Sequence, residues 1–170
     1  MNDEIAAQPG PGEHTRRFFG MREFQDTLRA SLALAVEQSW TQLLLCDPDF
    51  ADWPLGEQAV IDMLNAWAGP GRKLVMLAGR YDELLRRHGR FVPWRRNWSH
   101  IIECHKSGGA DPRMTPSALW SRKHMLHRFD LEGCSGLVTS EPVRCLRLKQ
   151  ELDDCLSVST PGFPASTLGL

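Results

Sequence analysis

The sequence predicts an α/β fold: a mostly parallel, mixed sheet flanked by helices on both faces. Two short apolar runs, LLLC at 43–46 and KLVMLA at 73–78, suit strands that are buried on both faces. Segments with helical periodicity alternate with these runs, which favours right-handed crossovers between parallel strands. A later series of strand-like segments without intervening helices predicts a mixed edge.

The first half of the chain alternates between helix and strand. Phe24, Leu28 and Leu32 recur at the four-residue spacing of an apolar helix stripe, and Gly69-Pro70-Gly71 marks a helix end. The expected elements are a helix over 20–39, a strand over 43–46, a helix over 56–68, a strand over 73–78 and a short helix over 81–88.

The second half is richer in strands. Pro93 makes a long uninterrupted helix over 91–98 doubtful, and Pro142 suits the first turn of a final helix. The expected elements are a strand over 99–105, short strands near Leu119, over 124–129 and over 136–139, and a helix from Pro142 to about Val158.

The length of 170 residues fits one domain. We expect residues 1–15 to form a flexible arm, because they contain Pro9-Gly10-Pro11-Gly12 and show no apolar periodicity. Residues 16–160 form the single α/β domain in this interpretation. Residues 161–170 form an extended tail, whose Phe163, Leu168 and Leu170 predict that it docks on the domain.

The net charge of −1 hides an uneven distribution. Residues 1–71 contain four arginines and eleven acids, net −7, whereas residues 72–128 contain thirteen cations and four acids, net +9. Residues 129–170 return to −3. A basic middle between acidic flanks indicates an anion-binding face, an electrostatic match between two faces of the fold, or a scattered solvated surface.

Five cysteines without paired CxxC spacing predict reduced thiols, and the polar start of the chain resembles no secretion signal. We therefore expect a cytoplasmic protein with no cofactor. No apolar run approaches the roughly 18 residues that cross a bilayer. Glycine-rich phosphate loops, GxSxG elbows and zinc-ligand spacings do not occur in the sequence.

An acidic loop follows the first buried run and contains Asp47, Asp49 and Asp52. Loops at the carboxyl ends of parallel strands form binding crevices. An apolar strand followed by DxD is also how haloacid-dehalogenase-like phosphatases begin, with one carboxylate as nucleophile and the other as acid. Such enzymes need a second acidic pair at a strand end to hold magnesium, and none is predicted here. The simpler reading is that Asp and Pro terminate the strand.

The stretch 86–98 is the most distinctive part of the sequence, because arginines alternate with tryptophans Trp94 and Trp98. Such a pattern can hold phosphates and stack bases. The alternative is that the tryptophans fill a core while the arginines pair with the acidic segment 47–62.

Several stretches of the sequence resemble two known families. AVIDMLNAWAGPGRKLVMLAGRYDELLRRHGRF resembles the helix–strand core of phospholipase-D-like half domains, and SGLVTSEPVRCLRLKQELDDCL is similar to the end of such a half. The phrases DFADWPLGE, HGRFVPWRRNW and PGFPASTLGL resemble a bacterial domain family that occurs alone or fused to acetyltransferases of the GNAT type. That family implies no activity for this chain.

The sequence departs from the phospholipase-D-like pattern where the chemistry would lie. Those enzymes use HxKxxxxD, in which the histidine is the nucleophile and the lysine binds phosphate. His105 is followed directly by Lys106, while Leu126 and Phe129 stand where His124 and His127 would each require a lysine. The resemblance therefore implies the half-domain architecture without the catalytic centre.

We thus expect a non-catalytic domain that binds an anionic ligand, a protein partner or a second copy of itself. Two alternatives stay open: a metal-dependent phosphatase or phosphodiesterase that uses Asp47 and Asp49, and a nucleic-acid binder that uses the Arg/Trp segment. The candidate anion-binding residues are Arg86, Arg90, Arg95, Arg96, Lys106 and Arg122.

Overall fold

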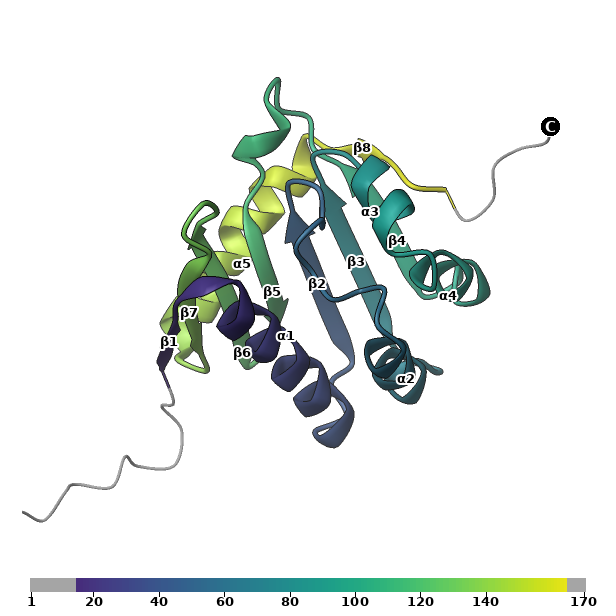
Figure 1. The fold of residues 1–170 in the computed structure, drawn as a ribbon, viewed down its shortest axis with the longest axis horizontal. Helices are drawn as coiled ribbons and strands as arrows, with labels where there is room; N and C mark the ends of the chain where they lie inside the picture. The colour runs from purple at the N-terminus through teal and green to yellow at the C-terminus, as the bar shows by residue number, and fades with distance from the viewer. Residues whose placement is uncertain (1–14, 165–170) are drawn as a thin grey trace, which may run out of the picture.

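A computed structural model gives the fold of the chain and describes residues 15–164 (Figure 1). Its centre is a single sheet of eight strands in the order β1-β7-β6-β5-β2-β3-β4-β8. The strands are β1 (Arg16–Phe18), β2 (Gln42–Asp47), β3 (Lys73–Ala78), β4 (Ile102–Lys106), β5 (Ser117–Ser121), β6 (His124–Asp130), β7 (Ser135–Thr139) and β8 (Thr160–Pro161).

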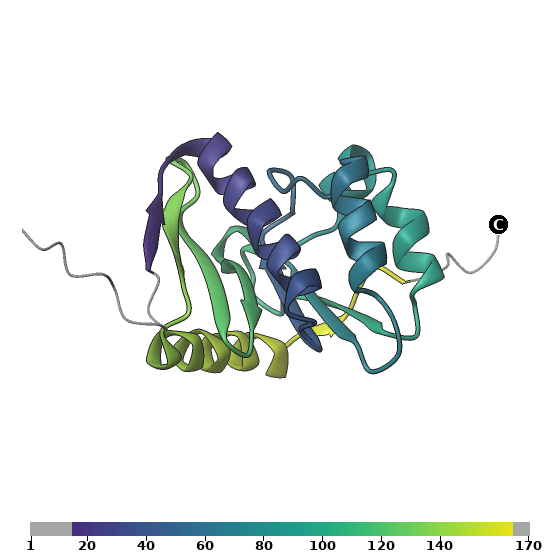
Figure 2. The ribbon, with the colours of Figure 1, turned by 90° about the horizontal axis from the view of Figure 1, so that it is seen from below.

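Five α-helices flank the sheet, and a 3-10 turn lies in the loop before β5. The helices are α1 (Gly20–Glu37), α2 (Gln58–Trp67), α3 (Asp82–Arg87), α4 (Phe91–Asn97) and α5 (Pro142–Ser157), and the turn is η1 (Pro112–Met114). In Figure 2, α5 lies on the opposite face of the sheet from α1 and α2. The prediction of an α/β fold with helices on both faces is confirmed.

The prediction that the sheet is mostly parallel is wrong. Only β2 with β3 and β3 with β4 pair in parallel. The pairings β1–β7, β7–β6, β6–β5, β5–β2 and β4–β8 are all antiparallel. Two of these five pairs follow from the length of the connections: β5, β6 and β7 follow one another through short turns, and such turns join only antiparallel strands.

Each face of the sheet has its own apolar core. Facing α1 and α2, the core includes Phe24, Leu28 and Leu64, together with strand residues such as Leu43 and Leu45. Facing α5, a smaller cluster is built from alternate strand residues and from Cys145, Leu148 and Leu152 of the helix. Alternation of strand side chains between two cores is what a central sheet of this kind requires.

The helix over 91–97 accommodates Pro93 because the proline is its third residue. The first turn of a helix has N–H groups without intrahelical partners, so a missing N–H costs little there. The strands β1 and β8 were not predicted, since each is only two or three residues long. Both lie at the edges of the sheet, and each pairs with a single neighbouring strand.

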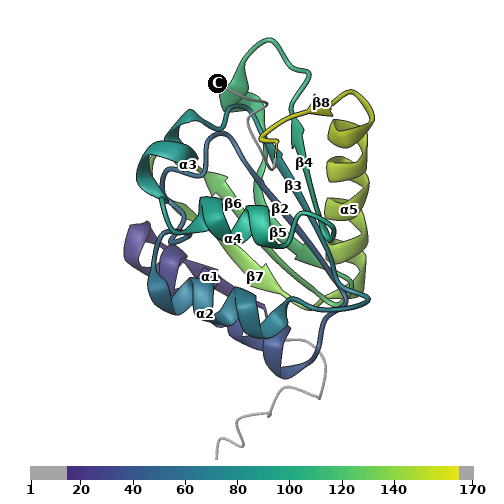
Figure 3. The same ribbon diagram turned by 90° about the vertical axis from the view of Figure 1, so that its right-hand side faces the viewer.

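The tail packs on the domain through Phe163. Its ring stacks on Tyr81 at 5.3 Å between centroids and lies 6.5 Å from Phe91, and the residue is buried. Figure 3 shows the backbone that leads to it, where the chain passes from the end of α5 into β8. The predicted arm at 1–15, apart from Thr15, and the tail residues Leu168 and Leu170 lie outside the described residues. Among residues 15–164, no helix is long and apolar enough to cross a membrane.

Candidate functional site

The acidic loop after β2 begins with a buried carboxylate. The side chain of Asp47 is 1% exposed, and its Oδ2 accepts hydrogen bonds from the backbone N–H groups of Asp49 (3.1 Å) and Phe50 (2.8 Å). These bonds fold the loop back on the strand end, in the manner of an Asx turn. Phe50 has a φ of 57°, so the turn passes through the left-handed region.

The guanidinium of Arg128, on β6, occupies the space that the acidic loop encloses. It donates to Asp47 Oδ1 and to Asp52 Oδ2, each at 2.9 Å, and its Nε donates to Ser117 Oγ at 3.0 Å. The guanidinium carbon lies 4.3 Å from the ring centroid of Phe24. Burial acts to lower the pKa of Arg128, but the nearby carboxylate of Asp47 and the hydrogen bonds raise it overall, so the group remains charged.

The predicted acidic site is therefore paired with a cation of the same chain, Arg128. Asp47 and Asp52 hold Arg128, while Asp49 Oδ1 accepts the N–H of Ala51 at 3.0 Å. No three His, Cys, Asp or Glu side chains among residues 15–164 converge as metal ligands do. A cation at this loop would have to displace a buried guanidinium.

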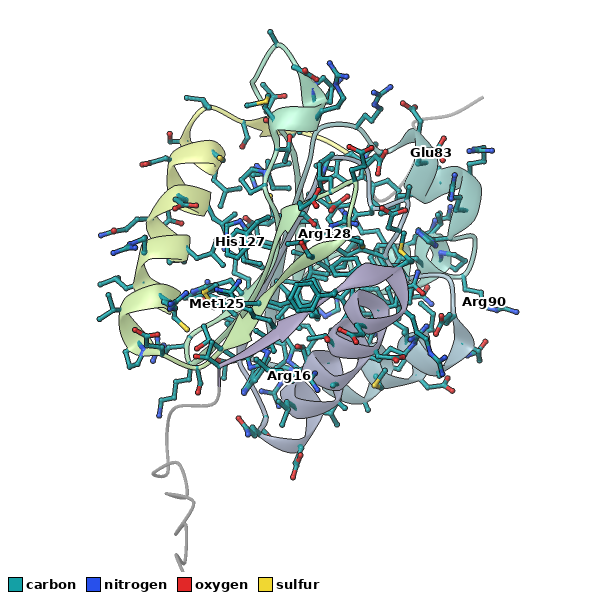
Figure 4. The ribbon with its side chains drawn as sticks, turned by 60° about the vertical axis from the view of Figure 1, so that its left-hand side comes forward. Arg16, Glu83, Arg90, Met125, His127 and Arg128 are labelled. Atoms are coloured by element: carbon teal, nitrogen blue, oxygen red, sulfur yellow. The ribbon has the colours of Figure 1, made fainter. Side chains whose placement is uncertain are left out.

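The sequence reading did not single out Arg128. One signal was available: His124–Asp130 has strand character, and Leu126 and Arg128 fall on the same face because strand side chains alternate. A charged residue in line with a buried leucine requires a buried partner of opposite charge. Figure 4 shows Arg128 pointing into the protein from β6 and His127 lying nearer to α5.

The arginines of the segment 86–98 have different surroundings. Arg86 and Arg87 both pair with Glu83 at 2.7 Å on the exposed side of α3. Arg90 extends outward in Figure 4, and its Nη1 donates to the carbonyl of Gly56 at 2.9 Å. Arg86 and Arg87 therefore find their acid within α3, not in the segment 47–62.

The two tryptophans of this segment pack inward. Trp94 is buried against Phe91, with ring centroids 5.4 Å apart. Trp98 is partly buried, packs against the same core and donates from Nε1 to Asn65 Oδ1 at 3.3 Å. The buried ring of Trp94 presents no open face of the kind that stacks a base, and the ring of Trp98 lies against His100 with centroids 5.7 Å apart.

Arg95 differs from its neighbours because it is buried, with 6% of its surface exposed. Its Nη2 donates weakly to the carbonyl of Phe163 at 3.4 Å, and the guanidinium carbon lies 5.8 Å from the Phe163 ring centroid. Its Nε and Nη1 have no hydrogen-bond partner within the described part of the chain. Arg95 and Arg96 line a cavity of about 230 Å³ together with Tyr81, Leu85, Val92, Phe163 and Pro164.

The six candidate anion-binding residues do not form one surface. Lys106 ends β4, where it pairs with Thr160 of β8. Arg122 lies in the β5–β6 turn, in a shallow cavity shared with Ser39 and Lys123. Only Arg95 and Arg96 share the cavity beside Phe163.

The three histidines that depart from the HxKxxxxD pattern, His105, His124 and His127, occupy separate environments. His105 is on β4, where its Nδ1 lies 3.2 Å from Ser159 Oγ. His124 is buried and its Nε2 lies 2.8 Å from Ser31 Oγ, whereas His127 stacks on Phe129 at 4.4 Å. The strands β5, β2 and β3 separate β4 from β6, so His105 does not meet the other two.

Comparisons with known proteins find similar folds but no family that matches the chain. No protein-family model matches the chain, and no curated protein matches it. Among solved structures, it is similar to TrmBL2, an archaeal chromatin protein whose structure shows a novel mode of DNA binding. That match has a TM-score of 0.62 and 13% identity, covering 93% of this chain and 57% of TrmBL2, so the chain spans little more than half of that protein.

A second similar structure is NucT from Helicobacter pylori, with a TM-score of 0.56 and 11% identity. The match covers 88% of this chain and 99% of NucT. At these identities the likeness is one of fold. A similar arrangement of strands and helices thus makes up nearly all of NucT and little more than half of TrmBL2.

Proposed function

We propose that this chain is a binding domain of phospholipase-D-like half-domain architecture that lacks the HxKxxxxD chemistry, and that it binds an oxyanion at Arg95. One observation carries the proposal: Arg95 is only 6% exposed, and two of its guanidinium donor atoms, Nε and Nη1, have no partners in the described residues. Burying a charge without a counter-charge costs several kcal/mol, which a bound anion would offset.

The groups around Arg95 are neutral. Burial raises the pKa of the Cys104 thiol to about 11, and it raises the pKa of the Tyr81 hydroxyl well above its ordinary value. Tyr81 donates its hydroxyl hydrogen to the carbonyl of His105 at 2.7 Å. Arg95 forms no ion pair within residues 15–164.

The cavity beside Arg95 suits a small oxyanion. Its walls are largely apolar, from Leu85, Val92 and Phe163, and an ion pair is stronger in such surroundings than in water. Guanidinium donors match the oxygens of phosphate and carboxylate groups in a bidentate geometry. Phosphate and acetate are therefore suitable probes of the site.

The test measures the thermal unfolding midpoint with and without inorganic phosphate, at constant ionic strength. Saturating phosphate should raise the midpoint of the unmodified protein by about 5 °C, because a ligand that binds only the folded state stabilises it. The variant Arg95→Met should lose this response, whereas Arg87→Met, which alters an exposed arginine nearby, should keep it. An acetate series distinguishes carboxylate from phosphate recognition. No response to either anion, or an equal response in Arg95→Met, would rule the site out.

The absence of catalysis has its own test. We expect purified protein with divalent metals to leave model phosphodiesters intact, because His105 lies far across the sheet from His124 and His127. Turnover that disappears in His105→Ala or His124→Ala would overturn the non-catalytic proposal.

A second candidate function is nucleic-acid binding, which the likeness to a DNA-binding chromatin protein favours. The exposed cations Arg86, Arg87 and Arg90 would contact phosphates, since Trp94 and Trp98 pack inward. Affinity for a DNA duplex should then fall steeply with added salt. Binding that is unchanged between low and moderate ionic strength would exclude this candidate.

A further inference from the structure

A second cavity lies between α1 and the β1–β7–β6 end of the sheet, away from Arg95. We call it the α1 pocket; its volume is about 710 Å³, within the range of small-molecule sites. Figure 4 shows Arg16, one of its lining residues, beside α1. The lining residues are Thr15, Arg16, Thr27, Ala30, Ser31, Leu34, Gln38, Trp40, Lys123, His124, Val138 and Ser140.

The inner wall of the α1 pocket is polar where the helix pattern predicts apolar residues. Thr27 and Ser31 are one turn apart on the buried stripe of α1, between the apolar residues Phe24, Leu28 and Leu32. Both hydroxyl residues are almost fully buried, at 2% and 1% exposed. Both hydroxyl groups are hydrogen-bonded within the protein, because Thr27 Oγ1 donates to the carbonyl of Glu23 at 2.6 Å and Ser31 Oγ contacts His124, so this polar wall can be buried at little cost.

His124 lies beside Ser31 and provides a directional polar group. Its Nε2 is 2.8 Å from Ser31 Oγ, and its ring packs against Trp40 with centroids 5.0 Å apart. Burial lowers the pKa of His124 to about 4, so the ring is neutral at physiological pH. Because Ser31 contacts Nε2, a ligand would have to engage the other ring nitrogen, Nδ1.

The rim of the α1 pocket is cationic. Arg16 and Lys123 are both exposed and line the opening from opposite elements, β1 and the β5–β6 turn. No Asp or Glu is among the lining residues. Arg16 Nη2 also donates to Thr27 Oγ1 at 3.4 Å, which connects the rim to the inner wall.

The remaining walls are apolar. Leu34 comes from α1, Val138 from β7 and Trp40 from the loop before β2. A ligand that complements the cationic rim, the polar inner wall and the apolar walls has one negative group and an apolar body. We infer that the α1 pocket binds a small organic acid, with its carboxylate toward Lys123, Arg16 and His124 and its apolar body against Leu34, Trp40 and Val138.

This inference is independent of the oxyanion site at Arg95, because the two cavities share no residue. The probe is 4-phenylbutanoate, and its uncharged amide is the matched control ligand. Isothermal titration calorimetry on the full chain should give an affinity for the acid about tenfold higher than for the amide, corresponding to about 1.4 kcal/mol. Equal affinities, or no binding of the acid, would overturn the inference.

Two pairs of variants locate the binding. Lys123→Glu should weaken binding of the acid about tenfold, whereas Arg122→Glu, the adjacent exposed cation outside the α1 pocket, should leave it within about twofold. Ala30→Trp should block the pocket and abolish binding, whereas Ala33→Trp, one turn along the exposed part of α1, should not. All four positions are exposed, so the variants should fold. Binding that survives both Lys123→Glu and Ala30→Trp would contradict the assignment.

Discussion

Arg128 and Asp47 form an ion pair of 2.9 Å although a whole strand, β5, lies between the strands that carry them. Their side chains are 2% and 1% exposed. Ser117 of β5 accepts a further hydrogen bond from the same guanidinium, so three neighbouring strands meet at one charged group. The acidic loop that the sequence offered as a catalytic feature is held in this way by a residue 81 positions further along the chain.

The first prediction concerns this ion pair. Asp47→Ala should lower the free energy of unfolding by about 3–5 kcal/mol, because it leaves a buried guanidinium with one carboxylate and removes two backbone hydrogen bonds. Asp49→Ala, which removes one partly buried turn contact, should cost about 1 kcal/mol. Urea denaturation measures both. Equal costs at the two positions would show that the pairing with Arg128 contributes nothing measurable.

The second prediction concerns magnesium. Trp53 is buried beside the acidic loop, with its ring centroid 5.0 Å from that of Phe50, so its fluorescence reports on changes in the loop. Millimolar Mg²⁺ should leave the emission unchanged, because the Arg128 guanidinium already pairs with both Asp47 and Asp52 and a metal ion would have to displace it. A saturable change that Asp49→Asn abolishes would instead support a metal-dependent phosphatase.

The third prediction concerns pH. Burial lowers the pKa of His124 from 6.5 to about 4, so the unfolded chain takes up a proton at this residue before the folded chain does. The contribution of the neutral His124 ring to the free energy of unfolding is complete above about pH 6.5 and is lost as the pH falls toward 4. The loss amounts to about 3 kcal/mol, by proton linkage.

Denaturant midpoints between pH 7 and pH 4 measure this loss. His124→Gln should flatten the pH dependence, whereas His100→Gln, at an exposed position, should leave it as it is. His127, whose pKa burial also lowers, contributes in the same direction and remains in both variants. A pH dependence that is the same in His124→Gln as in the unmodified protein would contradict the buried neutral ring.

The fourth prediction separates function from stability at Arg95. In buffer free of phosphate, Arg95→Met should leave the free energy of unfolding unchanged or raise it by about 1 kcal/mol, because an apolar side chain of similar length replaces an uncompensated charge. Chemical denaturation measures this directly. A loss of more than about 2 kcal/mol would mean that Arg95 already has a compensating partner within the protein.

Much of the fold follows from local pattern. The run KLVMLA coincides with β3, and LLLC falls within β2, because a strand buried on both faces has to be continuously apolar. The final helix begins at Pro142 as predicted. Strand direction was not predictable in this way, because apolar runs do not show whether neighbouring strands are parallel. The short turns between β5, β6 and β7 set two of the five antiparallel pairs.

The candidate sites were less accessible to sequence reasoning. Asp47 was identified from its place at a strand end, but its partner Arg128 is distant in sequence and reaches it only through the strand order β6-β5-β2. Arg95 was grouped with Arg86 and Arg90, although a helix turns it inward while its neighbours face outward. The α1 pocket depends on Ser31 and His124, which are 93 residues apart and which no spacing rule connects.

The positions of β1 and β8 at opposite margins of the sheet have a practical consequence for engineering. At the usual distance between neighbouring strands, eight strands place these margins roughly 34 Å apart. A circular permutant that joins the two would need a bridge of about ten extended residues or more. Fluorophores attached beside the two strands would be separated by a distance suited to energy transfer, and the signal would report directly on whether the sheet is intact.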